Sequence, residues 1–337
     1  MTDMTGYLLV IAAGLLQGSF MLPMKFIRRW AWENTWLVYS TTAYLVWPWL
    51  LALFTLPHLP AVFASTSARS LALVALFGVG WGLGAVTFGV GVDKLGMALG
   101  FTIIIGLAAS AGTLIPMAIF SRARFGQLPG LLTIAALLLV LTGIALCSWA
   151  GKLREPDQAV TGGKAGGSFR LGLAICIASG LLSSCGNLGF AFGSEVVRRA
   201  IEKGAPEPMA GNALWALITA PLFICNAGYC SWLLKKHRTA HLLFESGTRY
   251  NWVLGALMGF LWIAGFVCYA PGTRRLGSLG TSVGWAIMMS AMVITANLWG
   301  FLTGEWKAAS RRARRLLVGG VAILILAMGV IGYANQV

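Results

Sequence analysis

Charged residues are scarce in this chain. Lys, Arg, Asp and Glu together make up 10% of its 337 residues, whereas an average soluble protein carries about 25%. Hydrophobic residues make up 58%, and the mean hydropathy is +0.79. Because so few polar side chains could not cover the surface of a soluble fold, the composition excludes a soluble protein and predicts an integral membrane protein.

Histidine and acidic residues are also rare, and their scarcity argues against an active site. The chain has three histidines and ten acidic residues, and the histidines fall in predicted loops. A membrane enzyme needs clustered His, Asp or Cys at active-site spacing. The six cysteines fall within apolar runs without a C-x-x-C pair, so we expect small buried apolar residues. We therefore predict no enzyme, no metal site and no cofactor.

Long apolar runs are abundant. A membrane-spanning helix needs about 20 mostly apolar residues, and the length and lack of alternation of these runs exclude barrel strands. The first run has no basic region before it, so we expect a span there rather than a cleaved signal peptide. We predict ten spans, at residues 6–26, 36–56, 71–92, 95–120, 130–150, 171–193, 210–234, 250–270, 279–303 and 315–335.

The formal net charge is +15, which in a soluble protein would indicate a nucleic-acid partner. Here Lys and Arg lie in short segments between apolar runs, so we expect them to fix the topology in the lipid, and we predict no nucleic-acid partner. The odd-numbered loops hold 17 of them and the even-numbered loops hold eight. Positive charge stays inside, so the odd-numbered loops are predicted in the cytoplasm and both termini outside it.

One longer polar segment lies near the middle of the chain. Residues 151–170 are rich in glycine, but no strand precedes the glycines and no G-K-[ST] follows them. A flexible linker therefore fits better than a phosphate-binding loop. We expect a cytoplasmic linker that separates two five-helix halves, residues 1–150 and 171–337.

A short motif occurs twice, as "DKLGMALG" at 93–100 and "RRLGSLGT" at 274–281. At the same offset of 181 residues, Trp81 in the third span matches Trp262 in the eighth, together with neighbouring Leu and Gly residues. Leu and Gly are common enough to match by chance, but the shared Trp favours a true repeat. The repeat contains five spans, so after the first copy the chain lies on the other side of the membrane. The second copy therefore has the inverted orientation. We predict an all-α fold of ten transmembrane helices in a 5 + 5 inverted repeat, the architecture of many secondary transporters.

Four segments resemble a known family. They are "MKFIRRWAWENTW" (24–36), "GWGLGAVTFGVGVDKLGMALG" (80–100), "GTLIPM" (112–117) and "GEWKAASRR" (304–312). They are similar to the L-rhamnose–proton symporter family of the drug/metabolite transporter superfamily, over nearly the whole length. The resemblance implies a substrate cavity between the two halves and uptake of a deoxysugar with a proton across the bacterial inner membrane. The residues themselves leave open a carrier or exporter of another small metabolite in that superfamily.

A sugar site needs aromatic faces and amide or hydroxyl groups near the middle of the membrane. Trp81 and Trp262 lie about halfway along their spans, which argues against a place in the interfacial belt. Gln17 and Asn187 stand out because an unpaired amide is costly in lipid. Serine hydroxyls in membrane spans often form hydrogen bonds between helices, which is the alternative to a role in binding. The predicted substrate-binding residues are Gln17, Trp81, Asn187, Trp262, Trp285 and Ser290.

Proton coupling requires a titratable group that changes its surroundings during transport. No acidic residue falls at the centre of a predicted span. Glu33 and Asp93 are the predicted coupling residues, because they lie beside the first span and the repeated hinge. The alternatives are that Glu33 caps the second helix and that Asp93 pairs with Lys94 or a neighbouring loop.

Overall fold

The chain folds almost entirely into helices. The computed structural model describes residues 4–154 and 167–336, and no strand occurs among them. Within this part of the chain, ten helical segments are long and apolar enough to cross a membrane. They confirm the predicted all-α membrane fold and its ten spans.

Most spans are single helices, and two short helices, α4 and α7, lie in connecting loops. The elements in chain order are α1 (Met4–Ser19), η1 (Leu22–Phe26), α2 (Trp32–Thr41), η2 (Thr42–Val46), α3 (Trp47–Thr55), α4 (Leu59–Ser65), α5 (Ala68–Leu95), α6 (Met97–Phe120), α7 (Arg122–Phe125), α8 (Leu128–Arg154), α9 (Gly167–Ser183), α10 (Cys185–Phe192), α11 (Ser194–Glu202), η3 (Glu207–Met209), α12 (Gly211–His237), η4 (Ala240–Phe244), α13 (Arg249–Arg275), η5 (Gly277–Leu279), α14 (Gly280–Leu302) and α15 (Arg311–Ala334).

The predicted linker is shorter than expected, because helices enter it from both sides. α8 continues through Arg154, and α9 begins at Gly167. The remaining residues of the linker, 155–166, lie outside the described residues. The division into halves at residues 1–150 and 171–337 stays a prediction.

The first, second and sixth spans are interrupted. The first changes from an α-helix to the 3-10 helix η1, which has Pro23 near its start. The second contains the π-helical turn η2, and the sixth is broken at Ser184 and Gly193. Irregular backbone within a membrane is tolerated where protein surrounds it. The interruptions therefore indicate that these spans face the interior over part of their length.

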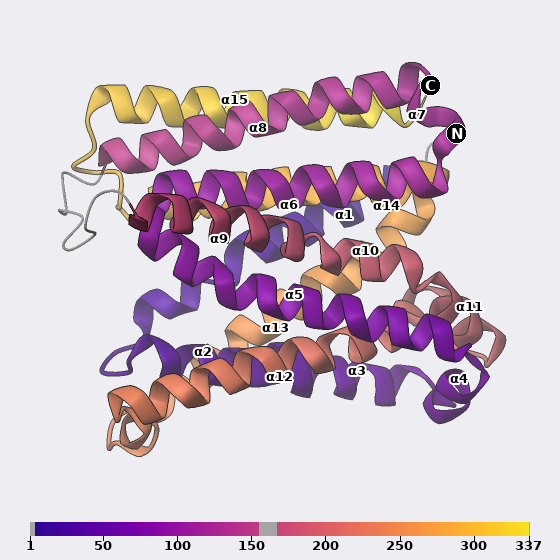
Figure 1. Ribbon diagram of the computed structural model, residues 1–337, viewed down its shortest axis with the longest axis horizontal. Coiled ribbons are helices and arrows are strands. Elements are labelled where there is room, and N and C mark those ends of the chain that lie inside the picture. The colour runs from indigo at the N-terminus through magenta and orange to yellow at the C-terminus, as the bar shows by residue number, and fades with distance from the viewer. Residues whose placement is uncertain (1–3, 155–166, 337) are drawn as a thin grey trace.

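The helices lie side by side along the long axis of the molecule (Figure 1). α8 and α15 form one edge, α2, α3 and α12 form the other, and the remaining spans lie between them. α8 packs on α15, and α12 packs on both α2 and α3. The intervening spans surround the centre of the molecule.

The contacts that join the first five spans to the last five occur in equivalent pairs. α1 packs on α13 and α14, while α9 packs on α5 and α6. In the same way α2 packs on α13, and α12 packs on α5. Exchanging the first span with the sixth, the second with the seventh and so on converts each pair into its counterpart. This correspondence supports the predicted repeat.

The doubled Leu-Gly motif places a glycine at the same kind of corner twice. Gly96 follows α5 with φ of +81°, and Gly277 follows α13 with φ of +79°. A β-carbon is unfavourable in this left-handed region, whereas glycine adopts it readily. Each glycine thus permits the sharp turn into the next span.

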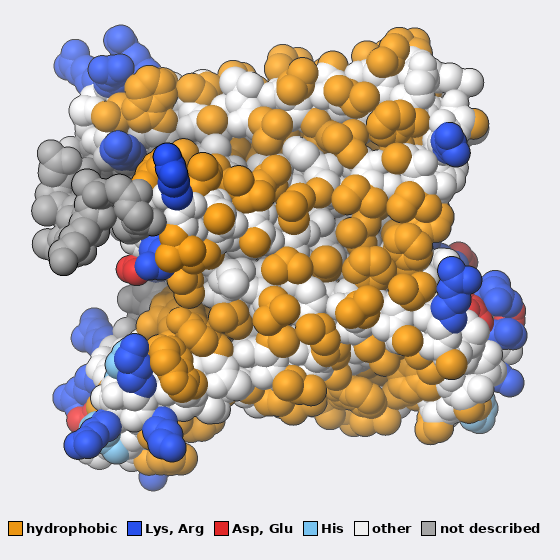
Figure 2. Space-filling view, in the orientation of Figure 1, with side chains coloured by type: hydrophobic (Ala, Val, Ile, Leu, Met, Phe, Trp, Pro, Cys, Tyr) orange, Lys and Arg blue, Asp and Glu red, His pale blue; other side chains and the backbone are white. Residues whose placement is uncertain are grey.

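Charged side chains gather at the two ends of the molecule, and hydrophobic side chains cover much of the surface between them (Figure 2). We call the end with the odd-numbered loops the odd-loop end. There Trp30 Nε1 donates to Leu242 O at 2.9 Å, and Asn251 Nδ2 donates to Arg28 O at 2.8 Å. The opposite, even-loop end carries both chain termini (Figure 1). Polar contacts therefore join loops that lie far apart in the sequence.

Candidate functional site

A continuous group of aromatic rings occupies the interior of the molecule. Each ring centroid lies within 6.0 Å of at least one other in the group. The rings come from the second, third, sixth, seventh, eighth and ninth spans. We define this aromatic cluster as Trp36, Tyr39, Tyr44, Trp81, Phe190, Trp215, Trp262, Phe266, Tyr269 and Trp285.

Trp81 and Trp262 meet within the aromatic cluster. Their ring centroids lie 5.5 Å apart, and the rings are tilted by 35°. Trp81 comes from α5 and Trp262 from α13, the two spans matched by the 181-residue offset. Both indoles also contact Phe266. The structure brings this predicted pair together from opposite halves, while its role in sugar binding stays a prediction.

Gln17 lies against the same part of α13. Its side chain is buried, and Nε2 donates to Trp262 O at 2.8 Å. Gly265 leaves the space for this amide, since a β-carbon there would lie 2.9 Å from Gln17 Nε2. The amide is thereby fixed against the backbone of the eighth span.

Asn187 joins four spans. Its amide is fully buried, and Nδ2 donates to Gly112 O at 2.7 Å and to Thr281 O at 3.1 Å. Its Oδ1 accepts a hydrogen bond of 2.7 Å from the hydroxyl of Tyr269. We call Asn187, Gly112, Tyr269 and Thr281 the Asn187 clasp. In this conformation the protein itself occupies both amide hydrogens and the amide oxygen of Asn187.

Trp285 and Ser290, both on α14, are buried. Trp285 Nε1 donates to Ala108 O on α6 at 3.0 Å, and Ser290 Oγ donates to Ala286 O of its own helix at 2.8 Å. Trp285 lies at the edge of the aromatic cluster, 6.0 Å from the Tyr269 ring. Both polar groups therefore contact backbone carbonyls.

A cavity of about 510 Å³ lies towards the even-loop end, between the sixth span and the turn from the eighth to the ninth. A volume of this order is typical of small-molecule sites. Phe190 and Thr281 connect the cavity to the aromatic cluster and the Asn187 clasp. We call it the even-loop vestibule, lined by Phe190, Ala191, Ser194, Val197, Arg198, Ile201, Glu202, Thr273, Arg274, Gly277 and Thr281.

Glu33 lies in the first turn of α2 at the odd-loop end, and the residue is 5% exposed. His237 Nδ1 lies 3.0 Å from Glu33 Oε1, and Thr239 Oγ1 donates to the same oxygen at 2.7 Å. The carboxylate therefore joins the start of the second span to the end of the seventh.

Asp93, the second predicted coupling residue, is exposed near the end of α5. It forms no ion pair within residues 4–154 and 167–336, so the alternative, pairing with Lys94, is not observed. The structure thus places the two predicted coupling residues in very different surroundings.

Glu305 forms a second tie at the odd-loop end. Its carboxylate pairs with Lys25 of the first span and with Arg154 at the end of α8. Partial burial acts to raise the pKa of Glu305, but the hydrogen bonds and charges of Lys25 and Arg154 outweigh it and hold the pKa below its ordinary value. The Arg154 guanidinium also lies 5.1 Å from the centre of the Trp306 ring.

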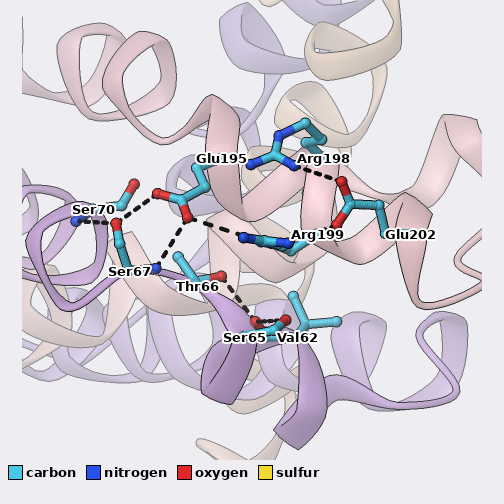
Figure 3. A network of polar contacts seen from close by, with 9 residues as sticks. All are labelled: Val62, Ser65, Thr66, Ser67, Ser70, Glu195, Arg198, Arg199 and Glu202. Atoms are coloured by element: carbon cyan, nitrogen blue, oxygen red, sulfur yellow. Dashed lines mark hydrogen bonds and ion pairs between the residues drawn. The ribbon is translucent and has the colours of Figure 1, made fainter.

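A corresponding tie lies at the even-loop end (Figure 3). Glu195 on α11 accepts hydrogen bonds from the backbone N–H and the hydroxyl of Ser67, at 3.0 and 2.6 Å. Ser67 caps α5, and Arg199 lies 3.9 Å from the Glu195 carboxylate. The sixth span is thereby joined to the start of the third.

Sequence reasoning did not single out Trp215 and Tyr269. Both are fully buried in the aromatic cluster, and Tyr269 supplies the hydroxyl of the Asn187 clasp. Each lies near the end of a predicted span, where an interfacial position is expected. A signal for Trp215 exists in the sequence, because "NALW" at 212–215 parallels "ENTW" at 33–36.

Comparison with known proteins gives one consistent result. An L-rhamnose-proton symporter of Cronobacter sakazakii is 28% identical over 326 residues, which cover 93% of this chain and 92% of the relative. The relatives of the same name from Shigella dysenteriae and Mannheimia succiniciproducens are 27% and 26% identical, with the same coverage. The family model described as L-rhamnose-proton symport protein (RhaT) matches residues 4–336. With the match extending over nearly every residue of a ten-span chain, the protein belongs to this family of transporters, which are not enzymes.

Proposed function

We propose that this protein is a secondary active transporter that carries a rhamnose-like deoxysugar together with protons. The observation that carries the proposal is the family match over residues 4–336, together with relatives named L-rhamnose-proton symporter. The match extends through all ten spans.

The chemistry of the interior supports a sugar as the substrate. The C–H faces of a sugar pack on aromatic rings, and its hydroxyls bond to amides and hydroxyls. The aromatic cluster supplies the aromatic rings, and Gln17 and the Asn187 clasp supply amide and hydroxyl groups. The vestibule next to them has the volume of a small-molecule site.

The arrangement of the spans supports alternating access between two inverted repeats, residues 1–150 and 171–337, as in the drug/metabolite transporter superfamily. Equivalent spans make equivalent contacts, and the first and sixth spans are both interrupted. Interrupted helices surround the substrate in many transporters. The vestibule then belongs to the even-loop side of the path.

Within this path, Trp81 and Trp262 stack on the sugar from opposite halves, and Gln17 bonds to a sugar hydroxyl. Asn187 exchanges its protein partners for the sugar when the clasp opens. Trp285 and Ser290 line the same region from the ninth span. Glu33 and Asp93 are the coupling residues predicted from the sequence, and the burial of Glu33 favours it.

The bias of Lys and Arg towards the odd-numbered loops supports an orientation with the odd-loop end in the cytoplasm and both termini outside it, in the bacterial inner membrane. Cysteines introduced singly into residues 155–166 test it. In intact cells they should resist a membrane-impermeant thiol reagent, and labelling from outside would reverse the orientation.

The proposal is tested with purified protein in proteoliposomes. Labelled L-rhamnose should accumulate inside the vesicles when the external medium is more acidic than the lumen, because protons then enter together with the sugar. It should not accumulate when the pH difference is reversed. A protonophore should abolish this accumulation. Accumulation of another metabolite in place of L-rhamnose would favour the alternative, a different carrier or exporter of the superfamily.

A further inference from the structure

We propose that the indole N–H of Trp215, on the seventh span, donates a hydrogen bond to a hydroxyl group of the bound sugar. The inference rests on the proposed sugar transport and adds a residue that selects the substrate. Trp215 thereby joins the binding residues predicted from the sequence.

The indole N–H of Trp215 is buried without a hydrogen-bond partner among the described residues. The residue as a whole is 1% exposed. A buried donor without an acceptor is costly, so native proteins provide partners for most such groups. The Trp215 N–H therefore requires an acceptor from outside the chain, which is either water or a ligand.

The position of Trp215 distinguishes it from other buried groups of this kind. In the described part of the chain these are Trp49 Nε1, Ser110 Oγ, Thr113 Oγ1, Arg199 Nε and Trp306 Nε1. A serine or threonine hydroxyl can rotate towards a carbonyl of its own helix. The Arg199 guanidinium bonds to Glu202 through another nitrogen, at 3.0 Å. Of the indoles, only that of Trp215 belongs to the aromatic cluster, and its N–H direction is fixed by the ring.

The repeat shows that the chain supplies a partner to the equivalent indole. Trp36, the counterpart of Trp215, donates to Asn226 Oδ1 on the seventh span at 3.1 Å. The same match aligns Asn226 with Trp47 on the second span. The Trp47 side chain has no acceptor atom, and its own N–H donates to Ala256 O at 3.2 Å. One copy of the repeat therefore has both donor and acceptor, and the other copy has the donor alone.

Phe190 connects the Trp215 donor to a cavity. Its ring stacks on the Trp215 indole, with centroids 5.1 Å apart and planes at 10°. Phe190 also lines the even-loop vestibule, whose volume of about 510 Å³ is typical of small-molecule sites. One aromatic side chain thus contacts both the unpaired donor and the cavity, and its displacement brings the donor within reach of a sugar in the vestibule.

The short helix α10 relates this displacement to the Asn187 clasp. α10 carries both Asn187 and Phe190, and it lies between the backbone breaks at Ser184 and Gly193. Interrupted helices surround the substrate in many transporters. Movement of α10 as a unit opens the clasp and uncovers the Trp215 N–H at the same time. The sugar then gains the Asn187 amide and the Trp215 donor in one step.

This role makes Trp215 selective for a hydroxylated substrate. An indole N–H donates a hydrogen bond and accepts none. A substrate with a hydroxyl oxygen at this point satisfies the donor, whereas an analogue without that oxygen leaves the donor unpaired. Sites built to bond a hydroxyl reject such analogues for this reason.

The experiment measures equilibrium binding of labelled L-rhamnose to purified Trp215→Phe and to a matched control, Trp49→Phe. Both changes keep an aromatic ring and remove a buried indole N–H that has no partner within the described residues. Trp215→Phe should bind L-rhamnose about two- to tenfold more weakly, which corresponds to the loss of one hydrogen bond. Trp49→Phe should bind it as the wild type does.

Competition by analogues of L-rhamnose that each lack one hydroxyl identifies the accepting group. One analogue should bind more weakly than L-rhamnose to the wild type and should lose no further affinity in Trp215→Phe. The other analogues should lose the same factor in the variant as L-rhamnose does. A loss of packing alone would instead weaken the binding of every analogue equally.

Unchanged binding of L-rhamnose by Trp215→Phe would overturn this role and leave the proposed function standing, and so would an equal loss for every analogue. If Trp215→Phe fails to fold, benzothienylalanine at position 215 gives the same comparison, because it keeps the shape of the ring system and lacks the N–H. Absence of L-rhamnose binding by the wild-type protein would overturn the proposed function and this role with it.

Discussion

Some buried amides and indoles of the interior have hydrogen-bond partners within the protein, and others do not. Gln17, Asn187 and Trp285 all have partners on other spans. In the described part of the chain, Trp215 Nε1 is buried without one, whereas its counterpart Trp36 donates to Asn226 at 3.1 Å. The residues that hold the interior closed and those with capacity for a ligand are therefore mixed within one cluster.

The Trp81–Trp262 contact should be replaced by contacts with the sugar during binding. Trp81→Ala and Trp262→Ala should each weaken L-rhamnose binding about fivefold, since loss of one aromatic contact costs about 1 kcal/mol. Binding is measured by the ligand-induced rise in the thermal midpoint of detergent-solubilised protein. Trp149→Ala, which removes an exposed indole from peripheral α8, is the control. Unchanged binding in both interior variants would make the two indoles packing residues.

The Asn187 clasp should contribute measurably to stability. Asn187→Ala removes three hydrogen bonds, although the Tyr269 hydroxyl still has Thr281 O at 3.1 Å as an acceptor. Each lost bond costs about 0.5–1.5 kcal/mol. The thermal midpoint should therefore fall clearly. Asn297→Ala is the matched control, because the side chain of Asn297 donates only to Val293 O of its own helix. Equal midpoints for the two variants would contradict the clasp.

At the scale of the elements, the repeated corner after the third and eighth spans depends on glycine. Gly96→Ala and Gly277→Ala should each destabilise the protein by about 1–2 kcal/mol, because alanine is strained at positive φ. Gly89→Ala within α5 meets no atom within 4 Å and should be neutral or slightly stabilising. Thermal unfolding of the three variants checks the expectation. A loss at only one of the two corners would weaken the equivalence of the spans.

The Glu305 tie between the first span, α8 and the loop before α15 should depend on pH. Because the pKa of Glu305 is lowered in the folded protein, its contribution is present above the ordinary Glu range and is lost as pH falls through the folded pKa. Glu305→Gln should therefore lower stability near neutral pH, by at most about 1 kcal/mol since the group is partly exposed. The difference from wild type should vanish at acidic pH. A constant difference across the titration would contradict the ion-pair origin.

The number of spans and the doubled corner could be predicted from the sequence, because both are local. Apolar length defines a span, and the Gly96 and Gly277 corners lie within a few residues of their motifs. The breaks at Ser184 and Gly193 were not predicted, since neither contains a proline and the run of residues 171–193 is long enough for one continuous helix. The Glu33–His237 contact joins residues 204 positions apart, so only the packing of α2 on α12 identifies it.

At the scale of the whole molecule, the two ends are held by different chemistry. The odd-loop end combines the Glu33–His237 pair with the Glu305 tie, while the even-loop end has the Glu195–Ser67 contact beside the vestibule. The burial of Trp215 could not be predicted from its position along the seventh span, because depth along a helix does not say which side of the helix faces the interior. Transport requires that one set of end contacts opens while the other stays closed.

The most direct test of sugar–proton symport is the pH of a weakly buffered suspension of proteoliposomes. Addition of L-rhamnose without any imposed gradient should make the external medium more alkaline, because protons enter with the sugar. A protonophore should abolish the change, and liposomes without protein should show none. Rhamnose entry without any change in external pH would contradict the account.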